Sequence, residues 1–178
     1  GLYIHYKKIA EDVNIPIILY NVPSRTGISI LPETVAKLSE IKNIVGIKEA
    51  SGSLDQVSKI ISLCPDDFVL LSGDDSLTLP IMSVGGKGVI SVAANIMPAQ
   101  VKEMVQSSLS NNWQQAQKIH IHLFDMFKAL FIETNPIPVK TCLYLMKMID
   151  LELRLPLTPP SEENKNKLEG ILKKYCLI

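Results

Sequence analysis

A lysine at the end of an apolar run is the first residue with clear chemical potential. Lys48 follows the apolar residues 44–47 and precedes a turn of small residues. A charged amine is costly in apolar surroundings unless it has a partner or a function. Such surroundings favour the neutral amine, which attacks carbonyl carbons to form an imine. Two interpretations therefore stay open, a buried ion-paired lysine and a nucleophile.

Tyr20 stands near the end of another apolar run, residues 15–22. Side chains alternate along a strand, and neighbouring strands lie about 4.8 Å apart. If the two runs form neighbouring parallel strands, the phenol of Tyr20 and the amine of Lys48 meet at the same end. A phenol there could relay the protons that imine formation requires. The alternative is that Tyr20 is an ordinary packing residue.

Three charged residues near predicted strand ends are further candidates. Arg25 lies in the segment after Tyr20, and its fork of donors suits a carboxylate ligand, although a solvated arginine would look the same. Asp74 and Asp75 follow the run of residues 68–72 and could act as acid–base groups. Capping of a helix that starts near Ser76 is the favoured interpretation for the two aspartates.

The elements that would position these residues form a simple series. Short apolar runs predict strands, and spacings of three and four residues predict helices. The expected strands are 15–22, 44–50, 68–72 and 89–93, and the expected helices are 1–13, 31–41, 53–63, 76–84, 98–109, 113–131, 136–149 and 161–175. Alternation of strands and helices predicts an α/β fold with a parallel sheet buried on both faces.

Two architectures fit this series, a small doubly wound sheet and part of a (β/α)8 barrel. A whole barrel takes about 250 residues, so this chain would hold only half of one. In the barrel alternative, residues 1–111 would form the second half of the barrel and residues 112–178 a C-terminal helical domain. In both architectures ligands bind at the carboxyl ends of the strands. The glycine-rich residues 85–88 precede a strand, so they are interpreted as a turn and not as a phosphate loop.

Composition excludes several classes of function. The 18 basic and 18 acidic side chains balance, so no nucleic-acid or membrane partner is expected. The three cysteines are far apart, which argues against a disulfide framework or a zinc site and favours a reduced, cytoplasmic location. No apolar run reaches the roughly 18 residues of a membrane span. Residue 1 is a glycine inside a helical pattern, so we expect an N-terminal part to be missing.

Several segments together resemble the dihydrodipicolinate synthase family of pyruvate-dependent class I aldolases. Residues 20–27 read Tyr-Asn-Val-Pro-Ser-Arg-Thr-Gly, and residues 46–52 read Gly-Ile-Lys-Glu-Ala-Ser-Gly. Further agreement lies in residues 71–75, 88–92 and 135–140, in matching order. The resemblance implies a (β/α)8 TIM barrel with a C-terminal helical domain.

The resemblance also implies roles for individual residues. Lys48 would form the Schiff base with pyruvate, and Tyr20 would relay protons. Arg25 would bind the carboxylate of L-aspartate 4-semialdehyde, while Ile90 and Gly73 would lie at the substrate. The product would be 4-hydroxy-tetrahydrodipicolinate, a precursor of diaminopimelate and lysine. No cofactor and no metal is implied, because the lysine imine serves as the electron sink.

Other outcomes are compatible with the same motifs. Related aldolases such as N-acetylneuraminate lyase share the lysine and the tyrosine, but generally lack an arginine in the context of Arg25. The chain could also be an inactive fragment or split-gene remnant, because the first four βα units of the family, with part of its pocket, are absent. The family resemblance implies a homotetramer for the full-length protein.

Overall fold

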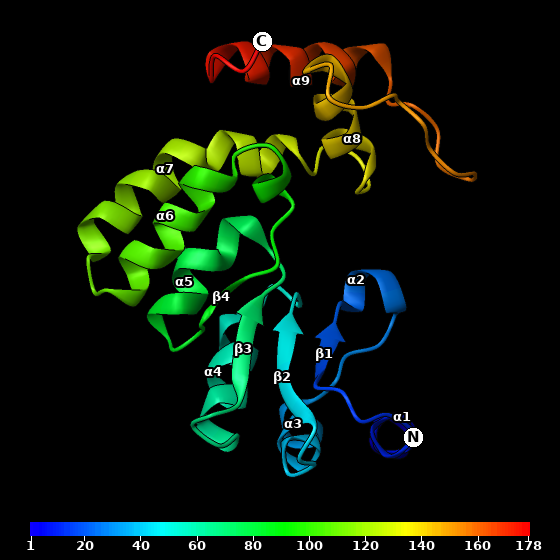
Figure 1. Ribbon diagram of the computed structural model, residues 1–178, viewed down its shortest axis with the longest axis vertical. Coiled ribbons are helices and arrows are strands. Elements are labelled where there is room, and N and C mark those ends of the chain that lie inside the picture. Colours follow the sequence, from blue (N-terminus) through cyan, green and yellow to red (C-terminus); the bar gives the residue numbers. More distant parts are fainter. The chain divides into compact units, whose positions relative to one another are not determined.

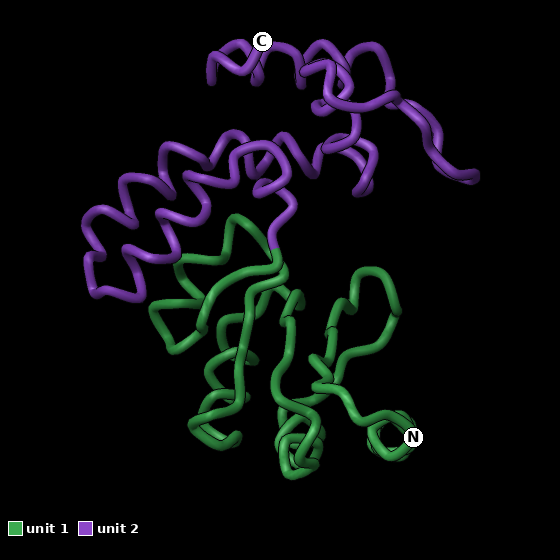
Figure 2. Tube along the Cα trace, viewed as in Figure 1, with its two compact units in different colours: residues 1–90 green, residues 91–178 purple.

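The computed structural model describes all residues, 1–178, and divides into two compact units. Residues 1–90 form unit 1 and residues 91–178 form unit 2 (Figure 2). The division precedes the predicted domain boundary at residue 111, because the helix expected at 98–109 packs against the helix that follows it.

Unit 1 contains the alternating strands and helices that the sequence predicts. Its elements are α1 (Leu2–Asp12), β1 (Ile17–Asn21), α2 (Pro23–Thr26), α3 (Pro32–Ser39), β2 (Ile44–Glu49), α4 (Leu54–Leu63), β3 (Val69–Ser72), the 3₁₀ helix η1 (Asp75–Leu77), α5 (Thr78–Ser83) and β4 (Gly88–Val89). The prediction of an α/β fold with a parallel sheet is confirmed.

The order of the strands separates the two architectures that the sequence left open. The four strands are all parallel and lie in the order β1-β2-β3-β4, with β1 and β4 at the edges (Figure 1). A doubly wound sheet has a point at which the strand order reverses. This sheet has no reversal, which is the arrangement of consecutive βα units in a barrel.

Only one face of the sheet is buried in unit 1. Leu19, Ile47 and Leu70 are at most 2% exposed and belong to a core shared with α3, α4 and α5. On the other face, Ile18 is 46% exposed and Tyr20 is 42% exposed. The prediction that residues 15–22 form a strand buried on both faces is therefore wrong for this chain, because its helices pack against one face only.

Two segments differ locally from the prediction. The segment after β1, for which no helix is expected, contains the short helix α2, which ends where Gly27 adopts a φ of 72° and donates its N–H to Pro23 O. The strand expected at 89–93 is only Gly88–Val89, although Ile90 N still donates to Ser72 O over 2.9 Å. Ser91 Oγ then accepts from Ala94 N over 2.8 Å, a turn that ends the extended backbone.

Side chains cap the helices that follow β2 and β3. The predicted cap is confirmed for Asp74, whereas Asp75 is itself the buried first residue of η1. Ser53 Oγ accepts from Gln56 N at the start of α4. Asp74 Oδ1 accepts from Ser76 N over 2.8 Å and from Leu77 N over 3.3 Å. These bonds satisfy amide groups that the first turn of a helix leaves without partners.

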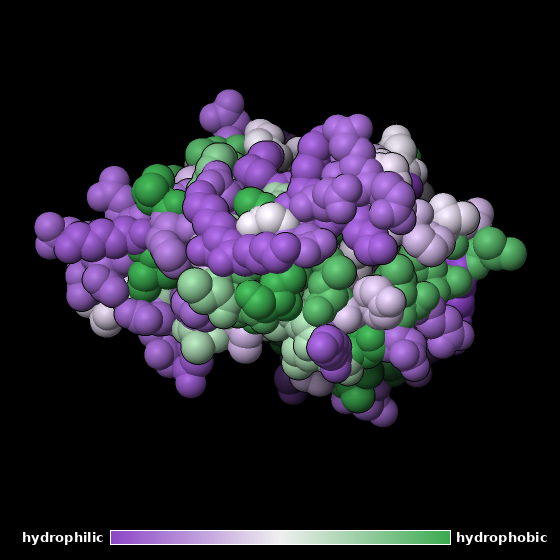
Figure 3. Space-filling model, turned by 90° about the horizontal axis from the view of Figure 1, so that it is seen from above, coloured by the Kyte–Doolittle hydropathy of each residue, from purple (hydrophilic) through white to green (hydrophobic).

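Unit 2 is entirely helical, as the pattern after residue 97 predicts. Its elements are the 3₁₀ helix η2 (Ala93–Asn95), α6 (Pro98–Leu109), α7 (Trp113–Ala129), α8 (Ile137–Leu145) and α9 (Glu162–Lys174). Helix α6 packs against α7, and α9 packs against both α7 and α8. The outer face of α9 is a hydrophilic band in Figure 3. No helix of the structure is both long and apolar enough to cross a membrane.

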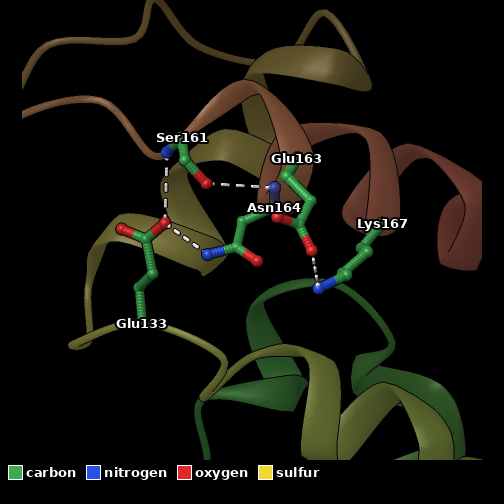
Figure 4. Close-up of polar contacts among 5 residues, drawn as sticks. All are labelled: Glu133, Ser161, Glu163, Asn164 and Lys167. Carbon is green, nitrogen blue, oxygen red and sulfur yellow. Dashed lines mark hydrogen bonds and ion pairs between the residues drawn. The ribbon is translucent and has the colours of Figure 1, made fainter.

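Glu133 ties the start of α9 to the segment that precedes α8. Its Oε1 accepts from Ser161 N over 3.2 Å and from Asn164 Nδ2 over 2.7 Å (Figure 4). Ser161 Oγ accepts from Asn164 N, so Ser161 also caps the helix. The carboxylate thus joins two segments that lie far apart in the sequence.

We expect Glu133→Ala to lower the free energy of unfolding of the helical unit by about 1 kcal/mol, because two hydrogen bonds lose their common acceptor. Thermal unfolding followed by circular dichroism measures the loss. The matched control is Glu163→Ala, which removes an exposed pair with Lys167 and an acidic side chain of the first turn of α9, and should have a smaller effect. Equal losses would contradict the role of Glu133.

The three cysteines should differ sharply in reactivity. Cys142 is fully buried in α8, and burial raises the pKa of its thiol to about 12. Burial also raises the pKa of Cys64, whereas Cys176 is exposed. The thiolate is the reactive form, so at pH 8 iodoacetamide should modify Cys176 first and Cys142 only after unfolding. Peptide mass spectrometry measures this order, and early modification of Cys142 would contradict it.

Candidate functional site

Tyr20 and Lys48 meet at the carboxyl ends of β1 and β2. The two residues are directly paired in the parallel register of these strands. Lys48 Nζ lies 4.0 Å from the centroid of the Tyr20 ring. The prediction that the two strands are neighbours and bring a phenol and an amine together is confirmed. The amine and the aromatic ring are therefore in contact at this end of the sheet.

Gly73 makes room for the lysine side chain. It follows β3, and its N–H donates to Glu49 O over 2.7 Å, which extends the ladder beyond the strand. A Cβ placed on Gly73 would lie 2.6 Å from the Cβ of Ala50 and 3.1 Å from Cε of Lys48. The absent side chain therefore allows the stem of Lys48 to pass beside β3.

Arg25 lies in the last turn of α2, the short helix directly after β1. Figure 1 shows α2 beyond the carboxyl end of β1, on the same edge of the sheet as the ends of β2 and β3. The arginine is exposed. A guanidinium at such a position is suited to bind a carboxylate that approaches this edge.

Ile90 completes the row of predicted residues. It follows β4 directly and is 45% exposed. The structure thus places all five predicted site residues in unit 1, at or just beyond the carboxyl ends of the four strands. No group of three or more His, Cys, Asp or Glu side chains is arranged to hold a metal ion.

Gly46 serves a different purpose from the one that its position suggests. Its place on the same face as Lys48 indicates free space below the lysine. In the structure, a Cβ on Gly46 would lie 2.4 Å from the carbonyl oxygen of Val69. The glycine therefore permits a close approach of the backbone of β3.

The sequence analysis missed a cluster of buried polar side chains behind the site. Asn21 and Glu49 are each 1% exposed and are joined by a hydrogen bond of 2.9 Å. They directly follow Tyr20 and Lys48, so alternation along the strands turns them to the opposite face. The signal available in the sequence was a polar residue at the end of each of two apolar runs, and the family resemblance implies no role for either residue.

Comparison with known proteins gives the context of this arrangement. Residues 1–175 match the Dihydrodipicolinate synthetase family. The 4-hydroxy-tetrahydrodipicolinate synthase of Sulfurihydrogenibium sp. (strain YO3AOP1) is 55% identical over all of this chain, which corresponds to 61% of that protein. This chain therefore spans about 61% of the length of such relatives.

Solved structures agree with the sequence comparison. The crystal structure of dihydrodipicolinate synthase from Aquifex aeolicus is 53% identical and has a TM-score of 0.98, over 99% of this chain and 61% of that one. The chloride-inhibited synthase of Acinetobacter baumannii, solved in complex with pyruvate, is 42% identical and has a TM-score of 0.97, over 100% and 61%. From the family match and these identities, the chain belongs to the dihydrodipicolinate synthetase family.

Proposed function

We propose that this chain provides the Schiff-base lysine of a lyase that condenses pyruvate with L-aspartate 4-semialdehyde to 4-hydroxy-tetrahydrodipicolinate. The observation that carries the proposal is the position of the Lys48 amine, 4.0 Å from the Tyr20 ring at the paired ends of two parallel strands. Family membership supports the same chemistry, because relatives more than half identical to the chain are named for this synthase.

In the proposed reaction, the neutral amine of Lys48 attacks the keto carbon of pyruvate. The resulting carbinolamine loses water to form an imine, and Tyr20 carries the protons that these steps exchange. Loss of a proton from the methyl carbon gives an enamine, which attacks the aldehyde carbon of the second substrate. The amino group of that substrate then closes the ring on the imine carbon and releases Lys48.

The other predicted residues take supporting roles in this proposal. Arg25 binds the carboxylate of the aldehyde substrate, and the main chain at Ile90 lies against bound pyruvate. Gly73 leaves the space through which Lys48 reaches both substrates, consistent with the contact its Cβ would make. The reaction uses the lysine imine as electron sink and needs no metal or organic cofactor.

We further propose that the four strands are the second half of a (β/α)8 barrel. The open face with Ile18 and Tyr20 would line the barrel interior, and the edges β1 and β4 would pair with strands of the remaining half. The chain would then be active only together with that half, as part of a homotetramer. Residues 112–178 would form the C-terminal helical domain. Sedimentation of the full-length protein tests the tetramer.

Reductive trapping tests the imine. The full-length protein that carries this chain is incubated with pyruvate and sodium borohydride, digested, and analysed by peptide mass spectrometry. We expect a reduced pyruvate adduct on the peptide that contains Lys48. Absence of an adduct on this peptide would overturn the proposed function.

The second substrate is tested by Arg25→Ala. Because the arginine is proposed to bind the aldehyde and not pyruvate, kcat/KM for the aldehyde should fall by about 100-fold, while trapping of pyruvate stays close to normal. The matched control is Arg154→Ala, an exposed arginine of the helical unit. Equal loss of both steps with Arg25→Ala would contradict this role and would reopen the assignment to another pyruvate aldolase.

A further inference from the structure

A buried carboxylate with only neutral partners lies directly behind the proposed site. Glu49 Oε2 accepts from Asn21 Nδ2 over 2.9 Å and from Gln56 Nε2 over 3.1 Å. Its other oxygen, Oε1, accepts from Ser51 N over 2.6 Å. No basic side chain pairs with Glu49, although it is 1% exposed.

A buried carboxylate stabilises the contact between two strands less than apolar side chains would. Burial of a carboxylate is unfavourable unless hydrogen bonds replace its water, and apolar side chains of similar volume would hold the strands together at lower cost. The surrounding core contains such an apolar contact. Leu19 and Ile47 are paired two residues before Asn21 and Glu49 and lie on the same face. A network of directed bonds instead fixes the relative position of the groups that it joins.

The network joins the segments that directly follow Tyr20 and Lys48. Asn21 and Glu49 are paired in the register and are the last residues of β1 and β2. Gln56 lies in α4, and Ser51 lies in the turn between β2 and α4. Asn21 Oδ1 also accepts from Ile30 N over 2.9 Å, which fixes the return of the chain after α2.

The connection to the reacting groups is through the backbone. Tyr20 and Lys48 immediately precede Asn21 and Glu49 and lie on the opposite face of the sheet. The bond from Ala50 N to Asn21 O, 2.9 Å long, continues the ladder past both pairs. A shift of Asn21 against Glu49 therefore also shifts the backbone of Tyr20 against that of Lys48.

We propose that Glu49 and Asn21 are positioning residues that hold the amine of Lys48 and the phenol of Tyr20 in the geometry for imine formation. This inference rests on the proposed function. A misplacement of reacting groups by about 1 Å can reduce a rate by about 100-fold. Loss of the hydrogen bonds around Glu49 could therefore produce a measurable loss in the rate of imine formation.

The test is a set of charge-exchange variants in the full-length protein. Glu49→Gln weakens the acceptor, and Asn21→Asp places a second carboxylate against Glu49. The double variant carries an amide at 49 and a carboxylate at 21, which restores a donor–acceptor pair with the polarity reversed. The measured quantity is the rate of pyruvate trapping by borohydride across a range of pyruvate concentrations.

We expect each single variant to lower the maximal trapping rate by about tenfold or more, with a change of less than about threefold in the half-saturating pyruvate concentration. The double variant should recover much of the lost rate, because the pair is coupled. A general loss of stability would not be rescued in the double variant. It would also not lower the maximal trapping rate more than it changes the half-saturating pyruvate concentration.

A matched control is Ile60→Val, which trims a fully buried side chain of α4 in the same core and lowers stability by about 1 kcal/mol. It should leave the trapping rate of the folded protein unchanged. Normal rates in both single variants, no recovery in the double variant, or an equal loss in Ile60→Val would overturn the positioning role. Failure of the unaltered protein to form any adduct would instead overturn the proposed function.

Discussion

Replacing Lys48 with alanine is expected to abolish the trapping of pyruvate by borohydride in the full-length protein. The reason is chemical, because alanine has no amine with which to form an imine. The loss should reach the detection limit of peptide mass spectrometry, while circular dichroism and thermal unfolding show a folded protein. Removal of a half-buried amine from an open sheet face leaves the core behind the strand intact.

The control for this prediction is Lys87→Ala. Lys87 is an exposed lysine immediately before β4, at the amino ends of the strands. Its removal should leave the adduct and its yield unchanged. An adduct that persists in Lys48→Ala, on whatever lysine, would contradict the assignment of Lys48 as nucleophile.

A second large effect is expected from Gly46→Ala, this time on stability. The added Cβ would lie 2.4 Å from the carbonyl oxygen of Val69 and 3.1 Å from the Val69 Cβ. Relief requires a shift of β3 against β2 in the middle of the sheet, so we expect a loss of about 3 kcal/mol in the free energy of unfolding. Urea unfolding of the full-length protein followed by fluorescence or circular dichroism measures it.

The same substitution elsewhere in the chain provides the control. Gly170 lies within α9, and a Cβ there would meet no atom within 4 Å. Alanine is the better helix former, so Gly170→Ala should raise stability by up to about 1 kcal/mol. If the two variants change stability in the same direction, close packing of β3 against Gly46 is not the reason for the glycine.

Much of the fold follows from patterns that are local in the sequence. Runs of β-branched and apolar residues predict β1, β2 and β3, and capping by Ser53 and Asp74 follows from side chains close to the amides that they bind. Alternation along each strand also predicts that Ile18 shares a face with Tyr20 and that Gly46 shares a face with Lys48. The length of β4 is not predicted by its apolar run, because a hydrogen bond from Ala94 N to Ser91 Oγ turns the chain after only two strand residues.

The amino-acid sequence by itself determined the parallel α/β arrangement, the helical second unit and the position of a lysine and a tyrosine near strand ends. Only the tertiary structure decided the strand order, the open face that exposes Tyr20, the close approach at Gly46 and the network around Glu49. The reason is physical. A strand pattern states which residues share a face, but partners such as Asn21 and Gln56 are separated along the chain and meet Glu49 only when three elements pack together. The position of Lys48 at a strand end is a local property of the sequence, whereas the groups that hold its strand in place come from several elements of unit 1.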